Sequence, residues 1–175
     1  MKLIILGGKA KGIPLAVPAS ARPSPVRLRK ALFDYLRLRF PKKGKFLDLY
    51  AGSGAVGLEA ASEGFSVVLV EKDRQAIALL RKNAARARLP VGIQPVPVEK
   101  YLAHPGGERF QIAFIAPPYP HNLEEDFTRL LNSGIVETGG LYILQHPAKL
   151  HWPKGERRVY GSNALTIIES QGHAT

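Results

Sequence analysis

The stretch from Phe46 to Gly57 constrains this chain more than any other, and it reads Phe-Leu-Asp-Leu-Tyr-Ala-Gly-Ser-Gly-Ala-Val-Gly. An apolar run ends in a loop with glycines at positions 52, 54 and 57, and an amphipathic segment follows. This order predicts a strand, a tight turn and a helix. Glycine permits positive φ and lets a ligand approach the main chain, and the free N–H groups at the start of the helix face the same space. We therefore expect a small polar ligand over Gly52–Gly54, at the carboxyl end of the first strand of an open α/β sheet.

The spacing Gly-x-Gly-x-x-Gly does not identify the ligand by itself. It fits a dinucleotide site for NAD or FAD and a site for S-adenosylmethionine (SAM) about equally. Asp48 lies late in the predicted strand, where a carboxylate can face an ammonium group but repels a pyrophosphate. Glu71 ends the next apolar run, and an acid there suits the ribose diol that both ligand classes carry. Asp48 therefore favours SAM over a dinucleotide.

Composition favours a single globular domain. The chain has 175 residues, of which 45% are hydrophobic, and this is enough for a sizeable core. It has no cysteine, which excludes disulfides, thiolate zinc sites and cysteine nucleophiles. No apolar run is long enough to span a membrane and no signal peptide is recognisable, so we expect a cytoplasmic protein with no membrane partner. The five histidines are scattered without ligand spacing, so no metal is expected, and a monomer is the simplest oligomeric state.

The formal net charge of +11 is concentrated in the N-terminal quarter. Residues 1–45 carry twelve Lys and Arg and one acid, whereas residues 46–175 carry thirteen Lys and Arg and thirteen acids. Such asymmetry indicates a polyanionic partner, most often nucleic acid. A generally basic surface with no specific partner is the alternative.

The N-terminal part predicts a small hairpin and a helix. Apolar segments at 2–6 and 13–17 form the hairpin, and a helix runs over 26–40, with Ser24 as its cap and Pro25 at its first position. We treat residues 1–43 as a basic extension packed on the core, 44–170 as the sheet domain and 171–175 as a frayed tail.

The remaining apolar segments alternate between strand and helix patterns. This alternation predicts a mostly parallel, doubly wound α/β sheet that closes with an antiparallel C-terminal pair. Beyond the first strand and its glycine loop, strands are expected at 66–70, 92–98, 110–115, 141–145, 157–160 and 165–169, and helices at 55–64, 74–87, 99–103 and 123–131.

A second group of residues, Ala116-Pro117-Pro118-Tyr119, follows the buried-type strand at 110–115. It belongs to the same edge of the sheet as the glycine loop. Two prolines fix the backbone and remove two N–H donors, which leaves the Pro117 carbonyl as an acceptor aimed in a set direction. Tyr119 offers an aromatic face to a flat base. A loop brace with a core tyrosine is the alternative.

Together these features resemble the Rossmann-like SAM-dependent methyltransferases. The resemblance rests on the block from Asp48 into Gly57-Leu-Glu-Ala, the acid at Glu71 and the Pro-Pro-Tyr segment. The stretch Arg22-Pro-Ser-Pro-Val-Arg-Leu-Arg-Lys-Ala-Leu-Phe-Asp-Tyr-Leu resembles more narrowly the RsmD family, which methylates the exocyclic N2 of a guanine in 16S ribosomal RNA. The likeness covers nearly the whole chain. It implies SAM as cofactor, S-adenosylhomocysteine as product, and ribosomal RNA or the assembling small subunit as partner.

The resemblance implies a role for each matching position. Residues expected to bind the cofactor are Asp48, Ala51, Gly52, Ser53 and Gly54 at the methionine part, Glu71 at the ribose, Lys72 beside the adenine, and the Val98 N–H at the adenine edge. Residues expected to hold the target base are Pro117, Pro118 and Tyr119, and residues expected near the RNA are Arg22, Arg27, Arg29 and Lys30.

Three positions depart from the family pattern. Ala116 replaces an Asp or Asn that accepts a hydrogen bond from the target amine, and Pro97 replaces an Asp or Asn that faces the adenine amine, where Glu99 is a possible substitute. Val26 replaces an acid in the N-terminal motif. Three functions stay open: the guanine-N2 methyltransferase, which we favour, a catalytically weakened relative that binds RNA, and an NAD-dependent oxidoreductase. The last leaves Asp48 and the Pro-Pro-Tyr segment unexplained.

Overall fold

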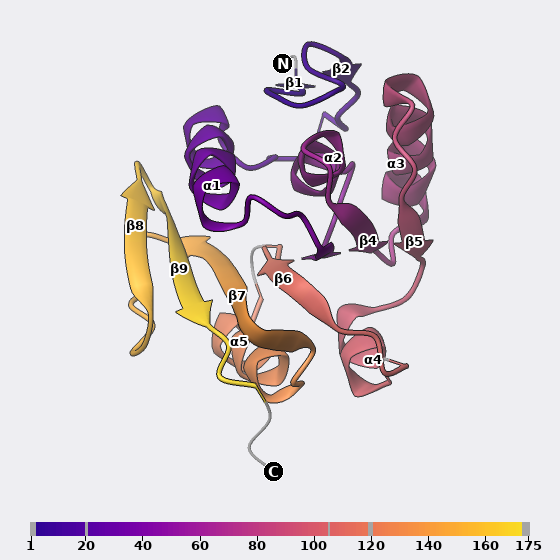
Figure 1. Cartoon of the computed structure of the whole chain (residues 1–175). Coiled ribbons are helices and arrows are strands. Elements are labelled where there is room, and N and C mark those ends of the chain that lie inside the picture. Colours follow the sequence, from indigo (N-terminus) through magenta and orange to yellow (C-terminus); the bar gives the residue numbers. More distant parts are fainter. Residues whose placement is uncertain (1–2, 20, 105, 119–120, 173–175) are drawn as a thin grey trace.

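The computed structural model of this chain describes residues 3–19, 21–104, 106–118 and 121–172, and the structural statements below refer to these ranges (Figure 1). Seven strands form the main sheet in the order β5-β4-β3-β6-β7-β9-β8. These strands are β3 (Lys45–Leu49), β4 (Ser66–Val70), β5 (Gly92–Gln94), β6 (Phe110–Ile115), β7 (Val136–Pro147), β8 (Glu156–Tyr160) and β9 (Asn163–Glu169).

The order in which the chain adds strands to the sheet reverses between β3 and β6. The chain runs outward from β3 through β4 to β5, and it then returns to place β6 on the other side of β3. The pairs β3–β4, β4–β5, β3–β6 and β6–β7 are parallel, whereas β9 is antiparallel to both β7 and β8. The predicted mostly parallel sheet with an antiparallel C-terminal pair is confirmed. Open α/β sheets bind ligands at such a switch, outside the carboxyl ends of the strands.

Helices cover both faces of the sheet, as a doubly wound fold requires (Figure 1). One apolar cluster joins the sheet to α1 (Val26–Arg39), α2 (Ala55–Ser62) and α3 (Arg74–Ala87), and the second joins it to α4 (Val98–Ala103) and α5 (Leu123–Asn132). Successive strand residues alternate between these clusters, so Phe46 belongs to the first and Leu47 to the second. Burial of these two apolar faces holds the sheet between the helix layers.

The N-terminal residues pack on the first helix layer. A short antiparallel pair joins β1 (Leu3–Ile4) to β2 (Pro14–Leu15), and Figure 1 shows it next to α2. The Glu59 carboxylate on α2 accepts the N–H groups of Leu6 (2.9 Å) and Gly7 (3.0 Å). Leu28 and Leu32 of α1 are buried in the same cluster as Phe46. The hairpin prediction is confirmed, while the boundary between 1–43 and 44–170 stays a prediction.

Three element predictions need correction. Helix α1 begins at Val26 with Pro25 as its N-cap and no side-chain cap, because the Ser24 hydroxyl bonds elsewhere. Strand β5 ends at Gln94 rather than at 98, since Pro95 and Pro97 cannot donate to a ladder. Strand β7 begins at Val136 rather than at 141, and its pairing with β6 changes register between Phe110 and Ile112. The other predicted helices and strands are found with ends shifted by at most two residues.

Two further findings concern membranes and the tail. Within the described ranges, no helix combines the length and the apolar character that spanning a bilayer needs. Of the predicted tail at 171–175, residues 173–175 lie outside the described ranges, and the Gly172 N–H donates to the Ser170 hydroxyl (3.2 Å).

Candidate active site

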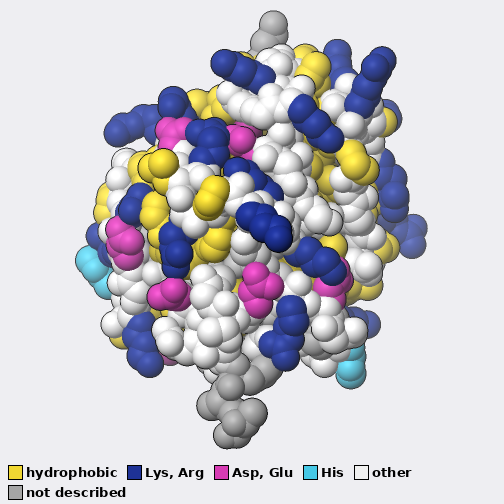
Figure 2. Space-filling model, viewed as in Figure 1, with side chains coloured by type: hydrophobic (Ala, Val, Ile, Leu, Met, Phe, Trp, Pro, Cys, Tyr) yellow, Lys and Arg dark blue, Asp and Glu magenta, His cyan; other side chains and the backbone are white. Residues whose placement is uncertain are grey.

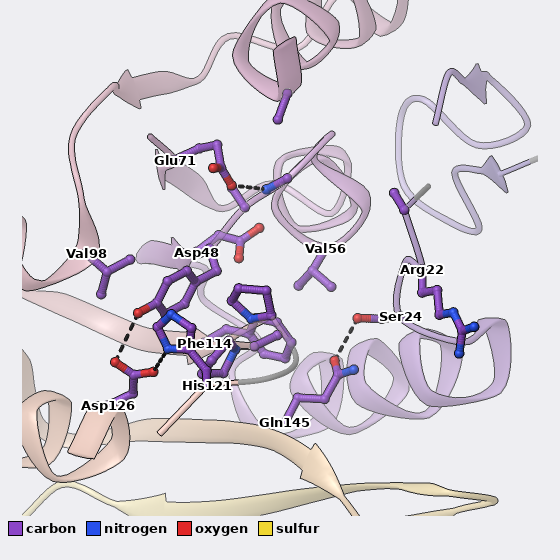
Figure 3. Close-up of a pocket in the computed structure, with 18 of the residues that line it drawn as sticks. Arg22, Ser24, Asp48, Val56, Glu71, Val98, Phe114, His121, Asp126 and Gln145 are labelled. Atoms are coloured by element: carbon purple, nitrogen blue, oxygen red, sulfur yellow. Dashed lines mark hydrogen bonds and ion pairs between the residues drawn. The ribbon is translucent and has the colours of Figure 1, made fainter. Parts of the chain in front are cut away.

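A cavity of about 1370 Å³ opens at the carboxyl ends of β3, β4, β6 and β7 (Figure 3). It lies at the switch in strand order, where the fold places ligands. Most of the residues predicted to bind a cofactor or a base line it together, namely Asp48, Ala51, Gly52, Ser53, Glu71, Lys72, Val98, Ala116, Pro117 and Pro118, and Arg22 joins them. Two segments that are far apart in sequence therefore share one cavity.

The glycine loop has the left-handed backbone that its sequence predicts. Gly52 (φ 58°) and Gly54 (φ 98°) both have positive φ, and so does Tyr50 (φ 66°). A Cβ added at Gly52 would meet no atom within 4 Å, so the main chain there is open to a ligand. A Cβ at Gly54 would lie 2.5 Å from Leu80 Cδ1, so this glycine allows α2 to pack against α3. Gly54 is absent from the cavity lining, and its contribution is the turn itself.

Asp48 is a buried carboxylate beside this loop. Its Oδ2 accepts the N–H of Gly57 (2.9 Å), and a Cβ at Gly57 would come 2.9 Å from the same oxygen. Burial raises the pKa of Asp48 to about 8, with a smaller rise from the nearby Glu71 charge, while the Gly57 hydrogen bond opposes the shift. The ionised form is costly here without a cation, so this site suits a ligand that brings an ammonium group.

Glu71 holds the glycine loop to the start of α3. Its Oε1 accepts the N–H of Gly52 (2.8 Å), and its Oε2 accepts those of Lys72 (3.0 Å) and Asp73 (2.9 Å). A carboxylate has about four acceptor positions, so Oε1 keeps one for a ligand hydroxyl. Glu71 thus fixes the loop and still faces the cavity.

The adenine side of the predicted cofactor site is built from the start of α4. Val98 is the first residue of that helix, so its N–H has no acceptor within the helix. Pro97 forms the N-cap and has no side-chain acceptor, whereas the exposed Glu99 lines the cavity. Glu99 lines the same cavity as Val98, and its role as the acceptor that Pro97 lacks stays a prediction.

The proline segment continues the ladder between β3 and β6. The Ala116 N–H donates to the Leu49 carbonyl (3.4 Å), which places the segment beside the glycine loop. Ala116 and Pro117 are half-buried and Pro118 is exposed, and all three line the cavity. Tyr119, the third residue predicted to hold the base, lies outside the described residues.

A polar cluster that the sequence analysis did not predict lies on one wall of the cavity (Figure 3). Asp126 is buried and accepts hydrogen bonds from the Tyr50 hydroxyl (3.0 Å), His121 Nδ1 and Arg129 (3.4 Å). The Tyr50 and His121 rings meet edge to face at 5.4 Å. Burial and then the Asp126 charge raise the pKa of Tyr50 well above its usual range, so its hydroxyl remains a donor. The spacing of Asp126 and Arg129 on α5 was the sequence signal available for this cluster.

The opposite wall joins β7 to the segment ahead of α1. The Ser24 hydroxyl donates to Gln145 Oε1 (2.7 Å) across the cavity edge (Figure 3). His146 beside it is a structural residue, because its Nδ1 donates to the Pro147 carbonyl (2.8 Å) and its Nε2 accepts from the Thr166 hydroxyl (2.7 Å). Burial lowers the pKa of His146, in agreement with a neutral ring.

The four basic residues predicted near RNA occupy different environments. Arg22 is exposed and lines the cavity, while Arg27 and Lys30 are exposed on α1 outside it. The prediction for Arg29 is wrong, because its side chain is fully buried and pairs with Glu59 (3.3 Å) and the Ile4 carbonyl (3.4 Å). Figure 2 shows Lys and Arg side chains spread over the face viewed, with fewer acids among them. Among the described residues, no group of three or more His, Cys, Asp or Glu is arranged to hold a metal ion.

Comparison with known proteins shows the family of this chain. Residues 3–169 match the family model described as conserved hypothetical protein 95. The chain is 33% identical over 184 residues to the ribosomal RNA small subunit methyltransferase D of Escherichia coli K12, covering 97% of this chain and 92% of that one.

Solved structures agree with the fold. A hypothetical protein of Thermus thermophilus shares 63% identity, with a TM-score of 0.93 over 95% of this chain and 99% of that chain. A 16S rRNA N2 methyltransferase (RsmC) of Thermus thermophilus, solved with AdoMet and guanosine, has a TM-score of 0.75 at 21% identity, covering 97% of this chain and 49% of that chain. At this lower identity the likeness concerns the fold.

Proposed function

This chain belongs to the family of conserved hypothetical protein 95, the RsmD family, and we propose that it transfers a methyl group from SAM to the exocyclic N2 of a guanine in small-subunit ribosomal RNA. Membership identifies it as a SAM-dependent RNA methyltransferase. The observation that carries the finer proposal is the shared cavity, in which the glycine loop and a buried carboxylate lie beside the proline segment. A methyl donor and a flat amine substrate need such adjacent sites.

The residues of the glycine-loop side fit SAM. The Asp48 carboxylate would hold the ammonium group of the methionine part, the open main chain at Gly52 would contact the same part, and Glu71 Oε1 would accept a ribose hydroxyl. The Val98 N–H and Glu99 would face the adenine, with Lys72 at its side. When bound, SAM supplies a methyl group on a sulfonium, whose sulfur leaves as a neutral thioether.

The residues of the proline side position the acceptor. In the transfer, the amine nitrogen would form the new N–C bond as the S–C bond breaks, and one amine proton would pass to bulk water once the methylated base leaves the cavity. Because the leaving group is already good, the protein contributes mainly orientation and exclusion of water. The Pro117 carbonyl would accept one amine N–H. The rings of Pro117 and Pro118 would border the base. A paired or stacked guanine has to be flipped out to reach this cavity.

The RNA would approach from the side of the cavity where Arg22 is exposed. Arg27 and Lys30 on α1 would add phosphate contacts, and Arg29 would not. Phosphate contacts of this kind make affinity fall steeply with salt. Free ribosomal RNA and an assembling small subunit both offer this chemistry, and the transfer assay below compares them.

The proposal is tested in two steps. Calorimetry with SAM, S-adenosylhomocysteine and NAD should give binding of the first two and none of NAD. Transfer of a tritiated methyl group to unmodified small-subunit RNA or particles should then yield N2-methylguanosine on nucleoside analysis. Methylation at another atom or base would contradict the guanine-N2 assignment and leave the methyltransferase assignment in place.

A second candidate function is favoured by Ala116, whose methyl group cannot accept a hydrogen bond. In this case the chain is a catalytically weakened relative that binds RNA. Loss of one preorganised polar contact typically costs on the order of 100- to 1000-fold in rate. Binding of SAM and RNA with no methyl transfer under single-turnover conditions would favour this candidate.

A further inference from the structure

Gln145 and Ala116 follow the last matched pair of two neighbouring strands. In the parallel ladder between β6 and β7, Ile115 pairs with Leu144. Ala116 and Gln145 come directly after this pair, and both line the cavity. Neighbouring strands are about 4.8 Å apart, which is within reach of a side chain. Ile115 and Leu144 belong to the apolar cluster under α4 and α5. Ala116 and Gln145 therefore face the opposite side of the sheet, toward α1.

The Gln145 amide is anchored to the segment ahead of α1 by a hydrogen bond. Its Oε1 accepts the hydroxyl of Ser24 at 2.7 Å, and the two residues are 121 positions apart in the sequence. Both are half-buried, and both line the cavity. Figure 3 shows the amide beside Ser24, on the side of the cavity away from His121 and Asp126. A carbonyl oxygen has two lone pairs, so Oε1 can accept a second donor from the cavity.

The chemistry of the amine calls for such an acceptor. An exocyclic amine carries two N–H groups, and under the proposed function the Pro117 carbonyl accepts one of them. The Ala116 methyl accepts none, and Asp48 is committed to the glycine-loop side through its bond to Gly57. Two acceptors orient both N–H groups and ease the loss of a proton, whereas a single acceptor leaves the second N–H group without a partner in the cavity.

We propose that Gln145 Oε1 accepts the second N–H of the target amine, supplying the acceptor that Ala116 lacks, with Ser24 as the residue that positions the amide. This inference rests on the proposed function. It assigns the second acceptor to β7 rather than to the proline segment. An amide suits this role because it accepts without gaining or losing a proton.

Removal of the acceptor tests the inference. Gln145→Leu should lower the single-turnover rate of methyl transfer on the order of 100-fold, while SAM affinity and the thermal midpoint stay at wild-type values. Gln145→Glu, which keeps an acceptor oxygen, should retain most of the rate. Ser24→Ala should lower it several-fold, because the amide is then free to turn. The matched control is Gln94→Leu, since Gln94 is an exposed glutamine at the end of β5 outside the cavity lining.

A double-mutant cycle with Ala116→Asp distinguishes a role of Gln145 as a hydrogen-bond acceptor from a role in packing. If Gln145 already accepts the amine, Ala116→Asp should change the wild-type rate little and restore at least tenfold in the Gln145→Leu background. Equal gains in both backgrounds, or wild-type transfer by Gln145→Leu, would overturn the inference alone. Wild-type protein that binds SAM but transfers no methyl group to RNA would overturn the proposed function and the inference with it.

Discussion

The half of the cavity at the ends of β3 and β4, which we call the glycine-loop half, is held by carboxylates that accept backbone N–H groups. Asp48 bonds Gly57, and Glu71 bonds Gly52. The half at the ends of β6 and β7, the proline-segment half, is held by bonds between side chains. Ser24 bonds Gln145 and Tyr50 bonds Asp126, across 121 and 76 positions of sequence. The first half is thus encoded locally, whereas the second depends on tertiary assembly.

The N-terminal segment that reaches the proline-segment half is likewise held by contacts between residues far apart in the sequence. Arg22 and Ser24 reach the proline-segment half from the segment between the hairpin and α1. The hairpin end of this segment is tied to α2 through Glu59, and α1 is tied to the same acid through Arg29. Burial raises the pKa of Glu59 and lowers that of Arg29, with their mutual attraction opposing both shifts. Arg29, which the sequence predicted as an RNA contact, therefore helps to hold the segment that reaches the proline-segment half.

The largest expected effect is on stability. Arg29→Met should lower the free energy of unfolding by about 3–5 kcal/mol, because it leaves Glu59 buried without its cation. Denaturant unfolding followed by circular dichroism measures this change. At low temperature the folded fraction should still bind SAM with wild-type affinity, since the glycine-loop half keeps its own bonds.

The control for this prediction is Arg37→Ala. Arg37 also pairs with an acid of the α2 end, Glu63, but 43% of its side chain is exposed. Water around the exposed Arg37 side chain weakens its attraction to Glu63, so the change should stay within about 1 kcal/mol. Equal losses of unfolding free energy in both variants would show that burial does not increase the contribution of the Arg29–Glu59 pair to stability.

The next largest effect is on the binding of SAM, the ligand proposed for the glycine-loop half. Asp48→Asn should weaken SAM binding by about 100-fold, because a buried carboxylate that pairs with an ammonium group contributes several kcal/mol. Asparagine keeps an acceptor for the Gly57 N–H, so the loop should hold its shape. Calorimetry measures the affinity, and RNA binding in the absence of SAM serves as the control, which should not change. A SAM affinity within about threefold of wild type would contradict the assignment of Asp48.

The sequence predicted the glycine-loop half nearly completely because its contacts are short in range. Asp48, Gly52 and Glu71 belong to one strand–loop–helix–strand unit, and their spacing alone brings them together. Only Gly54 differed, since its bare Cα serves packing against Leu80 rather than the lining of the cavity.

The proline-segment half was predicted only where it is continuous in sequence. Pro117 and Pro118 were found because they follow a recognisable strand. Gln145 was missed because an isolated amide on a strand has no local signature. Asp126 was missed because its spacing from Arg129 indicates a pair on the helix but not the contacts with Tyr50 and His121. Arg29 was misread for the same reason, because the partner that buries it is thirty residues away.

A further effect, smaller than the two above per pH unit, appears in the pH dependence of stability without ligand. The pKa of Asp48 is about 8 in the folded protein against 3.8 for an unperturbed aspartate, so the native state holds one more proton than the unfolded chain between these values. Stability should therefore fall as pH rises through this window, by at most about 1.4 kcal/mol per pH unit, and level off above it. Asp48→Asn should remove that slope. Denaturant unfolding from about pH 5 to about pH 9 compares the two proteins, and parallel curves would contradict the raised pKa.

Tyr50→Phe probes the bond between Tyr50 and Asp126 in the proline-segment half. The buried Asp126 would lose its Tyr50 donor and keep His121 and Arg129, so the free energy of unfolding should fall by about 1 kcal/mol. Because Asp126 lies on the proline-segment half, methyl transfer should slow more than SAM binding weakens. Thermal unfolding and single-turnover transfer measure the two effects. A loss confined to SAM affinity would place Tyr50 in the glycine-loop half instead.

The smallest expected effect is that of Arg22, an exposed arginine, on RNA binding. Arg22→Ala should weaken RNA binding a few-fold and reduce the slope of log affinity against log salt by about 0.7–0.9, which corresponds to one phosphate contact. SAM affinity and stability should not change, because Arg22 is exposed at the cavity. Lys11→Ala is a matched control, since Lys11 is an exposed cation in the hairpin loop outside the cavity lining. An equal loss of slope in both variants would mean that the RNA follows the general positive field of the N-terminal quarter and makes no particular contact beside the proline-segment half.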